Sequence, residues 1–167
     1  MRVLAIDASL RHTGVAVVEQ ENGHARAVFY GTIHNAPALR SSACLVAIRE
    51  QLRQLILQHQ PECCAMEAVI YVQSYKTAIT LGAARGAAIL AAAENQLPVF
   101  EYAPTRVKQS AAGSGGAAKS QVAFMMRALL GLTETPDPDA ADALAIALTH
   151  LRADAAGRLG LPGVKQI

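Results

Sequence analysis

The order of apolar runs along the chain is the feature that most constrains its fold. Three short runs rich in β-branched residues occupy residues 3–6, 14–18 and 27–33, and a polar turn at residues 21–24 separates the last two. Runs of this length and composition, joined by tight turns, are typical of β-strands that pair antiparallel. The first part of the chain is therefore predicted to form a three-stranded meander.

Helical and strand patterns alternate in the rest of the chain. Apolar side chains recur every three or four residues over residues 39–59, which predicts a helix that Pro61 ends. The later segments, in chain order, are a strand at 63–69, a helix at 77–95, a strand at 97–102, a glycine-rich loop at 113–116, and helices at 119–130 and 136–151. Strands separated by helices favour parallel crossovers. The whole order predicts an α/β fold in which helices flank a mixed five-stranded sheet.

Length and composition indicate one domain. With 167 residues and 52% apolar side chains, the chain can build a single core, which we assign to residues 1–155, followed by a loose tail at 156–167. No apolar run is long enough to cross a bilayer, and Asp7 interrupts the first run too early for a secretory signal, so a cytoplasmic protein is expected. Three cysteines without C-x-x-C spacing are predicted to be reduced core residues. These are Cys44, Cys63 and Cys64.

The distribution of charge is more informative than the net charge of +2. Between residues 73 and 133 the chain carries six Lys or Arg side chains and only two acidic ones, Glu94 and Glu101. A basic stretch of this kind suits contacts with phosphate, although each basic residue alone could be an ordinary solvated surface residue. The six are Lys76, Arg85, Arg106, Lys108, Lys119 and Arg127.

Four carboxylates occupy positions where a structural residue would normally be apolar. Asp7 ends the first strand, and Glu67 lies near the end of the fourth. Asp139 and Asp142 are three residues apart in the last helix and share one face. Each has a structural alternative, because Asp often caps a turn and acidic residues favour a helix N-terminus. Glu67 is the hardest to explain in this way, since an ionised buried Glu is rare unless it is paired.

Carboxylates that gather in one place repel each other and need a cation. Oxygen ligands alone select a hard ion, so Mg²⁺ is the expected cofactor, with Mn²⁺ as a substitute. Two such ions about 4 Å apart could activate water and stabilise the leaving oxygen in phosphodiester cleavage. The carboxylates thus predict a metal-dependent hydrolase.

Ordered segments of the chain resemble the RuvC family of crossover junction endodeoxyribonucleases. Residues 3–14, Val-Leu-Ala-Ile-Asp-Ala-Ser-Leu-Arg-His-Thr-Gly, are similar to the first family motif, residues 65–67 to the second, and residues 139–145 to the last. The connecting segments also match in order and spacing, namely 81–86, 98–102, 107–109 and 119–122. The resemblance covers nearly the whole chain, from about residue 2 to residue 150.

The resemblance implies an RNase H-like fold and a homodimeric, magnesium-dependent endonuclease that resolves four-way Holliday junctions by paired symmetric nicks. A branch-migration helicase complex would be a further partner. Lys108 and Lys119 would contact phosphate or assist at the scissile group, and Lys119 is counted among the catalytic residues. Lys76 and Arg85 are further candidates for DNA contacts, although the small residues around Arg85 fit either a dimer face or packing on its own sheet. The metal ligands implied are Asp7, Glu67, Asp139 and Asp142.

The chain departs from the family pattern in two places. Residues 7–10 read Asp-Ala-Ser-Leu where the family usually has Asp-Pro-Gly-Ser. Ile70 and Ser74 stand where the family commonly has an aromatic residue, which would stack on a base at the junction centre, and an asparagine. Because Ile70 cannot stack, we expect Tyr71 or Tyr75 to take this role, and Tyr71 is favoured. The alternative is that Tyr71 fills the core.

Other functions fit parts of the pattern. Kinases and chaperones of the same fold also follow an aspartate with Thr-Gly, as Asp7 and residues 13–14 do, but they need a second lobe for which 167 residues leave no room. A non-catalytic junction-binding module would be expected to have lost a carboxylate. A related nuclease acting on another branched or RNA-containing substrate shares the metal site and is the serious alternative.

Overall fold

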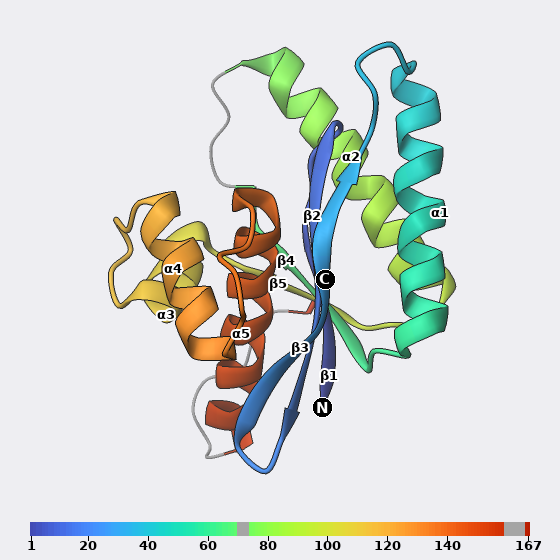
Figure 1. Ribbon diagram of the computed structural model, residues 1–167. Helices are drawn as coiled ribbons and strands as arrows, with labels where there is room; N and C mark the ends of the chain where they lie inside the picture. The colour runs from blue at the N-terminus through green and yellow to red at the C-terminus, as the bar shows by residue number, and fades with distance from the viewer. Residues whose placement is uncertain (70–73, 159–165) are drawn as a thin grey trace.

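A mixed five-stranded sheet forms the centre of the computed structural model, which describes residues 1–69, 74–158 and 166–167 (Figure 1). The strand order is β3-β2-β1-β4-β5. The first three strands pair antiparallel, whereas β4 runs parallel to β1 and β5 parallel to β4. The predicted α/β fold with a mixed sheet is confirmed. The strands are β1 (Arg2–Asp7), β2 (His12–Glu21), β3 (His24–His34), β4 (Cys63–Glu67) and β5 (Val99–Tyr102).

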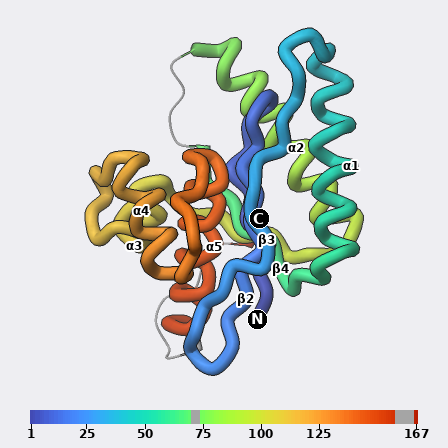
Figure 2. The backbone as a smooth tube through the Cα atoms, in the orientation of Figure 1, coloured from blue at the N-terminus to red at the C-terminus, as the bar shows by residue number. Residues whose placement is uncertain are grey.

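Helices cover both faces of the sheet. One face lies under α5, with α3 and α4 packed outside it, and the other lies under α1 and α2 (Figures 1 and 2). Amphipathic helices on two-sided apolar strands produce this three-layer arrangement. The helices are α1 (Ser41–His59), α2 (Tyr75–Glu94), α3 (Pro104–Ala112), α4 (Lys119–Leu130) and α5 (Pro138–Arg158).

Side-chain alternation along the central strands decides which layer each residue enters. In β1, Val3 and Ala5 join the core beneath α5, whereas Leu4 and Ile6 join the core beneath α1 and α2. Asp7 continues the first series. In β4, Cys63 and Ala65 also face α5, so the same period puts Glu67 on that side. Because β1 and β4 are parallel, their final carboxylates meet at one edge of the sheet.

The structure adds one helix that the sequence pattern did not predict. Helix α3 begins at Pro104, where the fixed φ angle of proline and its missing N–H suit the first helical position. Helix α5 also runs to Arg158 rather than ending near Leu151. Beyond it, Gln166 pairs with Phe100 of β5 and the Ile167 amide donates to the Val99 carbonyl, so the last two residues contact the sheet.

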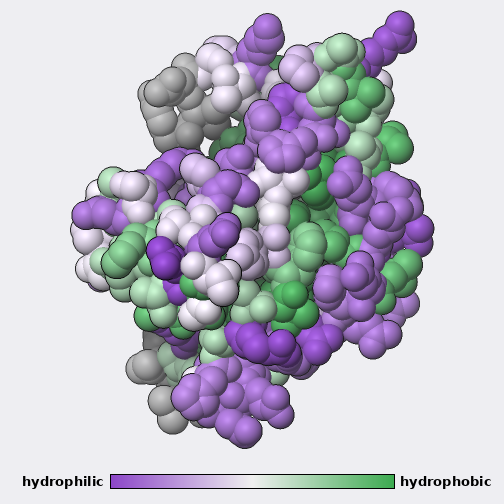
Figure 3. All heavy atoms as spheres, in the orientation of Figure 1, coloured by the Kyte–Doolittle hydropathy of each residue, from purple (hydrophilic) through white to green (hydrophobic). Residues whose placement is uncertain are grey.

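The surface and the cysteines complete the description of the fold. In the view of Figure 3, polar side chains cover α1 and an apolar strip lies between α1 and β3. The three cysteines are free and buried, as predicted. None of the helices in the described part of the chain is long and apolar enough to cross a membrane.

Candidate active site

A cavity of about 540 Å³ opens at the carboxyl ends of β1 and β4. Its walls combine the strand ends with Leu81 of α2 and with Pro104 and Val107 of α3. Three predicted carboxylates and three predicted basic side chains line it together: Asp7, Glu67, Asp142, Arg85, Lys108 and Lys119. The folded chain thus gathers residues that span more than half of the sequence into one pocket.

Asp7 is the most perturbed acid in this pocket. Burial raises the pKa of its carboxyl from 3.8 to about 7, and the neighbouring charges of Asp142 and Glu67 push it in the same direction. Asp139 raises this pKa further, and Lys119 lowers it. Burial and like charges both disfavour the ionised form. A nearby cation would relieve both effects.

Glu67 shows the same pattern more weakly. Burial raises the pKa of its carboxyl, and the charge of Asp142 adds to the effect. The ammonium groups of Lys108 and Lys119 act in the opposite direction. Two partly buried acids that are both destabilised by neighbouring negative charge form an electrostatically unfavourable group, which is a common property of functional sites.

Lys119 supplies the direct positive partner. Its Nζ donates to Asp142 Oδ2 at 2.9 Å, and this hydrogen bond raises the pKa of the lysine. The Asp142 side chain is 19% exposed, whereas that of Lys119 is 65% exposed. Lys119 therefore reaches in from the first turn of α4 and remains accessible from solvent.

Asp139 lies one helical turn before Asp142 and is not part of the cavity lining. Its backbone packs directly on β2. A Cβ atom added to Gly14 would lie only 2.0 Å from the Asp139 carbonyl oxygen, so any side chain at this position would push α5 away. Gly14 pairs with Asp7 across β1 and β2, so the close approach places the start of α5 beside Asp7.

Asp137 anchors the same end of α5. Its Oδ1 accepts the amide of Ala140 at 3.0 Å, as an N-cap side chain does, and also accepts the Thr32 hydroxyl of β3 at 2.9 Å. This second bond ties the helix to the sheet. The sequence pattern predicted that the segment with Asp137 begins this helix, but it did not predict the bond to Thr32.

Arg85 was expected to contact DNA, but the structure gives it internal partners. Its guanidinium donates to the Glu67 carbonyl oxygen at 2.6 Å and to Glu101 Oε1 at 2.5 Å, and the side chain is only 13% exposed. Arg85 thus fastens the end of β4 to β5, directly behind the Glu67 carboxylate. We regard it as a positioning residue, and its contact with DNA stays a prediction.

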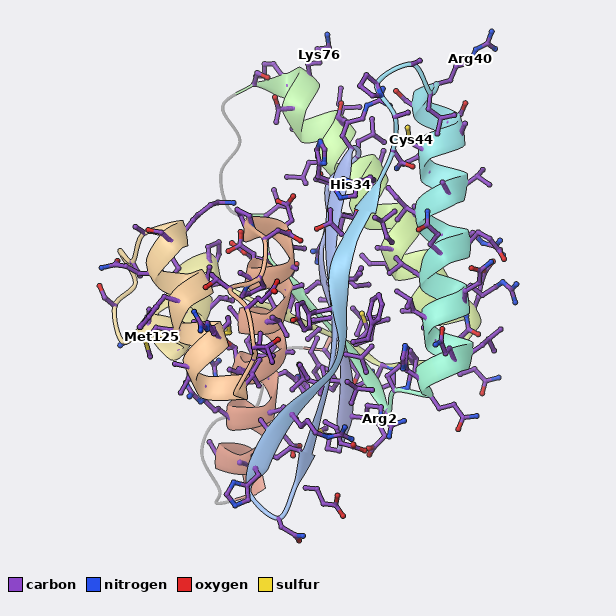
Figure 4. All side chains as sticks on the ribbon, viewed as in Figure 1. Arg2, His34, Arg40, Cys44, Lys76 and Met125 are labelled. Carbon is purple, nitrogen blue, oxygen red and sulfur yellow. The ribbon has the colours of Figure 1, made fainter. Side chains whose placement is uncertain are left out.

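The remaining predicted residues lie apart from the cavity. Tyr75 is 93% exposed, and Lys76 extends into solvent from the first turn of α2, above the sheet (Figure 4). Neither lines the cavity. Ile70 and Tyr71, which bear on the proposed base stacking, lie outside the described residues.

The donor set fits a hard divalent cation. All four candidate ligands supply carboxylate oxygen, and the raised pKa of Asp7 shows that negative charge is unfavourable there without a cation. Within the described ranges, no three His, Cys, Asp or Glu side chains already stand in a ligating arrangement, and Asp142 is turned to Lys119. Metal binding would thus require Asp142 to exchange its lysine partner.

The comparison with known families settles where the chain belongs. A family model described as crossover junction endodeoxyribonuclease RuvC matches residues 3–150. The chain belongs to the RuvC family. A RuvC from Akkermansia muciniphila is 55% identical over 151 residues, covering 90% of each chain. One from Caldicellulosiruptor saccharolyticus is 42% identical, covering 90% of this chain and 92% of the relative.

Solved structures agree with this assignment. RuvC of T. thermophilus, solved in complex with a Holliday junction substrate, superposes with a TM-score of 0.88 at 32% identity and covers both chains completely. A yeast mitochondrial Holliday junction resolvase has a TM-score of 0.67 at 15% identity, covers 95% of this chain and 80% of its own, and shows the shared fold. The RNase H-like fold predicted from the RuvC resemblance is confirmed.

Proposed function

We propose that this RuvC family member is a divalent-metal-dependent endonuclease that resolves Holliday junctions by paired symmetric nicks in DNA recombination and repair. One observation carries the proposal: Asp7, Glu67 and Asp142 line a single cavity together with Lys108 and Lys119. Acids and lysines in one open pocket suit a phosphodiester that approaches with metal ions. The T. thermophilus relative solved with a junction substrate supports the same substrate for this chain.

The carboxylates are the proposed metal ligands. Asp7 and Glu67 would bind from the strand ends and Asp142 from α5, with Asp139 entering from the preceding turn. Mg²⁺ is the favoured ion and Mn²⁺ the substitute, because both prefer oxygen donors. The chemistry that bound ions would supply is activation of a water as the nucleophile and stabilisation of the charge on the leaving oxygen.

The lysines have separate roles. Lys119 contacts Asp142, and its side chain is long and largely exposed. Its ammonium group can therefore move to contact a phosphate oxygen at the scissile group. Lys108, on α3 across the cavity, would hold the DNA backbone as a point charge. A lysine without an internal ion pair remains available for phosphate, and no ion pair of Lys108 is found among the described residues.

A homodimer would place two such cavities on one junction, and helix α2 carries a suitable surface. Tyr75, Ile79, Gly82, Gly86 and Leu90 recur every three or four residues and are exposed, with Ile79 exposed by 74%. Side chains of this spacing form one stripe along a helix. The region around both glycines is open within this chain, which leaves room for a second helix to approach. Ile79→Glu should therefore lower the mass measured by sedimentation from that of a dimer to that of a monomer. The control, Val46→Glu at an exposed position of α1, should leave the dimer intact. If both variants remain as stable a dimer as the wild type, α2 does not form the dimer surface.

We also propose that the protein is cytoplasmic and acts with a branch-migration helicase complex.

We further propose that a tyrosine stacks on a base at the junction centre. Tyr75, at the exposed N-terminal end of the α2 stripe, is the second candidate. Tyr71, favoured from the sequence, remains the first candidate. A stacked aromatic contributes about 1–3 kcal/mol per base. Tyr71→Ala should then slow cleavage of an intact junction more than that of a junction with unpaired central bases, and equal slowing would indicate a core residue.

One substrate panel tests the proposed activity. The protein is incubated with a mobile four-way junction, a replication fork, an RNA–DNA hybrid and plain duplex, each with Mg²⁺ and with EDTA. We expect paired cuts in the junction only when Mg²⁺ is present. Preferential cutting of the fork or hybrid would favour the related nuclease. Tight junction binding without cutting would favour a binding module.

A further inference from the structure

A pair of exposed histidines lies beside the active-site end of the sheet. His12 begins β2, His34 ends β3, and the two are directly opposed partners in the antiparallel ladder. The next pair along the same face is Gly14 and Thr32, the residues that contact the first turn of α5. The two imidazoles therefore project on the α5 side of the sheet, one step beyond the anchor of that helix. Figure 4 shows His34 at the upper end of β3.

The two imidazole rings contact each other through their Nδ1 atoms. Nδ1 of His12 and Nδ1 of His34 are 3.1 Å apart, and the ring planes are inclined at 78°. Metal–imidazole bonds of about 2.0–2.1 Å place two ligand nitrogens about 2.9 Å apart at a right angle and about 3.3 Å apart at a tetrahedral angle. The observed separation lies between these values. The separation therefore suits two nitrogens bound to one ion, which would replace the proton shared between them.

Other groups near the pair have partners of their own. The Arg11 guanidinium donates to the carbonyl oxygens of Ala36 and Leu39, so it does not occupy the space between the rings. The Asn35 amide donates to the Leu10 carbonyl. A direct hydrogen bond between two exposed imidazoles contributes little, because water competes for both nitrogens. The pair is thus free to exchange that bond for a ligand.

We propose that His12 and His34 form a site for a divalent transition metal, such as Zn²⁺, that is separate from the carboxylate site. Imidazole nitrogen suits Zn²⁺, Ni²⁺ and Cu²⁺, whereas the carboxylates select Mg²⁺ and Mn²⁺, so the two sites differ in the ions they prefer. Two protein ligands leave the other positions to water. The bound ion joins the start of β2 to the end of β3 and braces the strands against which α5 is anchored.

Zinc titration of the full-length chain tests this site. The protein is titrated at pH 7.5 against a chromogenic zinc chelator, in excess Mg²⁺ to occupy the carboxylates. We expect one equivalent of zinc in the wild type, loss of that equivalent in His12→Ala and in His34→Ala, and retention in His24→Ala, which removes another exposed histidine of the same sheet.

The outcomes separate this site from the proposed nuclease site. Circular dichroism melting identifies any variant that has not folded, and His34→Gln then provides a milder replacement that also lacks a ring nitrogen. Zinc binding that is equal in all variants, or absent from the wild type, would overturn the proposal. Junction cleavage with Mg²⁺ is measured in the same variants, so a failure of the zinc site leaves the test of the nuclease intact.

Discussion

The two ends of the β4–α5 interface carry polar groups with opposite properties. At one end, Glu67 of β4 and Asp142 of α5 both line the cavity. Burial and the negative charge of Asp142 raise the pKa of Glu67. At the other end, Cys63 of β4 and His150 of α5 meet at 3.2 Å between Sγ and Nε2, and the Tyr102 hydroxyl lies 2.8 Å from His150 Nδ1. The same two elements thus hold one unfavourable and one well-partnered polar cluster.

The two clusters differ in how far their polar side chains satisfy one another. Burial lowers the pKa of His150, so the ring stays neutral and uses both nitrogens in hydrogen bonds. Burial raises the pKa of the Cys63 thiol to about 12, which keeps it protonated. These three side chains satisfy one another, as buried polar groups normally must. At the other end Asp142 is paired with Lys119, whereas burial and neighbouring negative charges raise the pKa of Asp7 and Glu67.

Loss of a carboxylate should have the largest effect. Glu67→Gln, Asp142→Asn, Asp139→Asn or Asp7→Asn each removes ligand charge with little change of shape. Because loss of an outer-shell partner alone costs about 10–100-fold, we expect cleavage of a four-way junction to fall by more than about 100-fold. Junction binding in EDTA should persist, as measured by gel shift. A variant that keeps near-normal cleavage would remove its residue from the site.

Loss of the Arg85 contacts with the Glu67 carbonyl and Glu101 should have an intermediate effect. Glu101→Gln weakens the ion pair of Arg85, and Arg85→Lys replaces the two separate guanidinium nitrogens that bond the Glu67 carbonyl and Glu101 with one ammonium. We expect cleavage to fall about 10–100-fold, with a higher Mg²⁺ requirement. Junction binding by Glu101→Gln should be unchanged. If Arg85→Lys instead weakens binding and leaves the Mg²⁺ requirement unaltered, Arg85 contacts DNA rather than positioning Glu67.

The cluster of Cys63, Tyr102 and His150 should affect stability and not cleavage. His150→Ala leaves the buried Tyr102 hydroxyl without its partner, which costs about 1–3 kcal/mol of unfolding free energy. Since the folded pKa of His150 lies below 6.5, the unfolded chain binds an extra proton and wild-type stability falls as the pH drops below that value. Urea unfolding at pH 7.5 and 5.5 should show a smaller pH dependence in the variant. A large loss of cleavage per folded molecule would mean that the two clusters are coupled.

The sequence predicted the fold well because local patterns carry most of it. Short apolar runs gave the strands, and their alternation places Asp7 and Glu67 on one side of the sheet. Helix α3 was not predicted because it is short and begins at Pro104, and a proline also commonly ends a strand or helix. The carboxylates were found because acids are unusual at the ends of buried strands.

Contacts between distant segments could not be predicted in this way. Thr32 and Asp137 are 105 residues apart, and no local pattern indicates that they bond. The close approach of Gly14 to Asp139 depends in the same way on how α5 crosses the sheet. Arg85 was recognised as a cation, but its internal partners became evident only in three dimensions. The sequence therefore predicted the candidate ligands, and the structure shows which side chains contact them and the elements that carry them.

Thermal melting at pH 8 with and without Mg²⁺ tests most directly whether the acidic cluster is built for a cation. Because the folded pKa of Asp7 is raised to about 7, this group lowers stability increasingly as the pH rises from 3.8 through 7, and the full penalty is present at pH 8. In EDTA, Asp7→Asn should melt at a higher temperature than the wild type. Mg²⁺ should then raise the wild-type Tm more than that of Asp7→Asn. A lower Tm for Asp7→Asn in EDTA, with equal Mg²⁺ shifts in both proteins, would contradict the account.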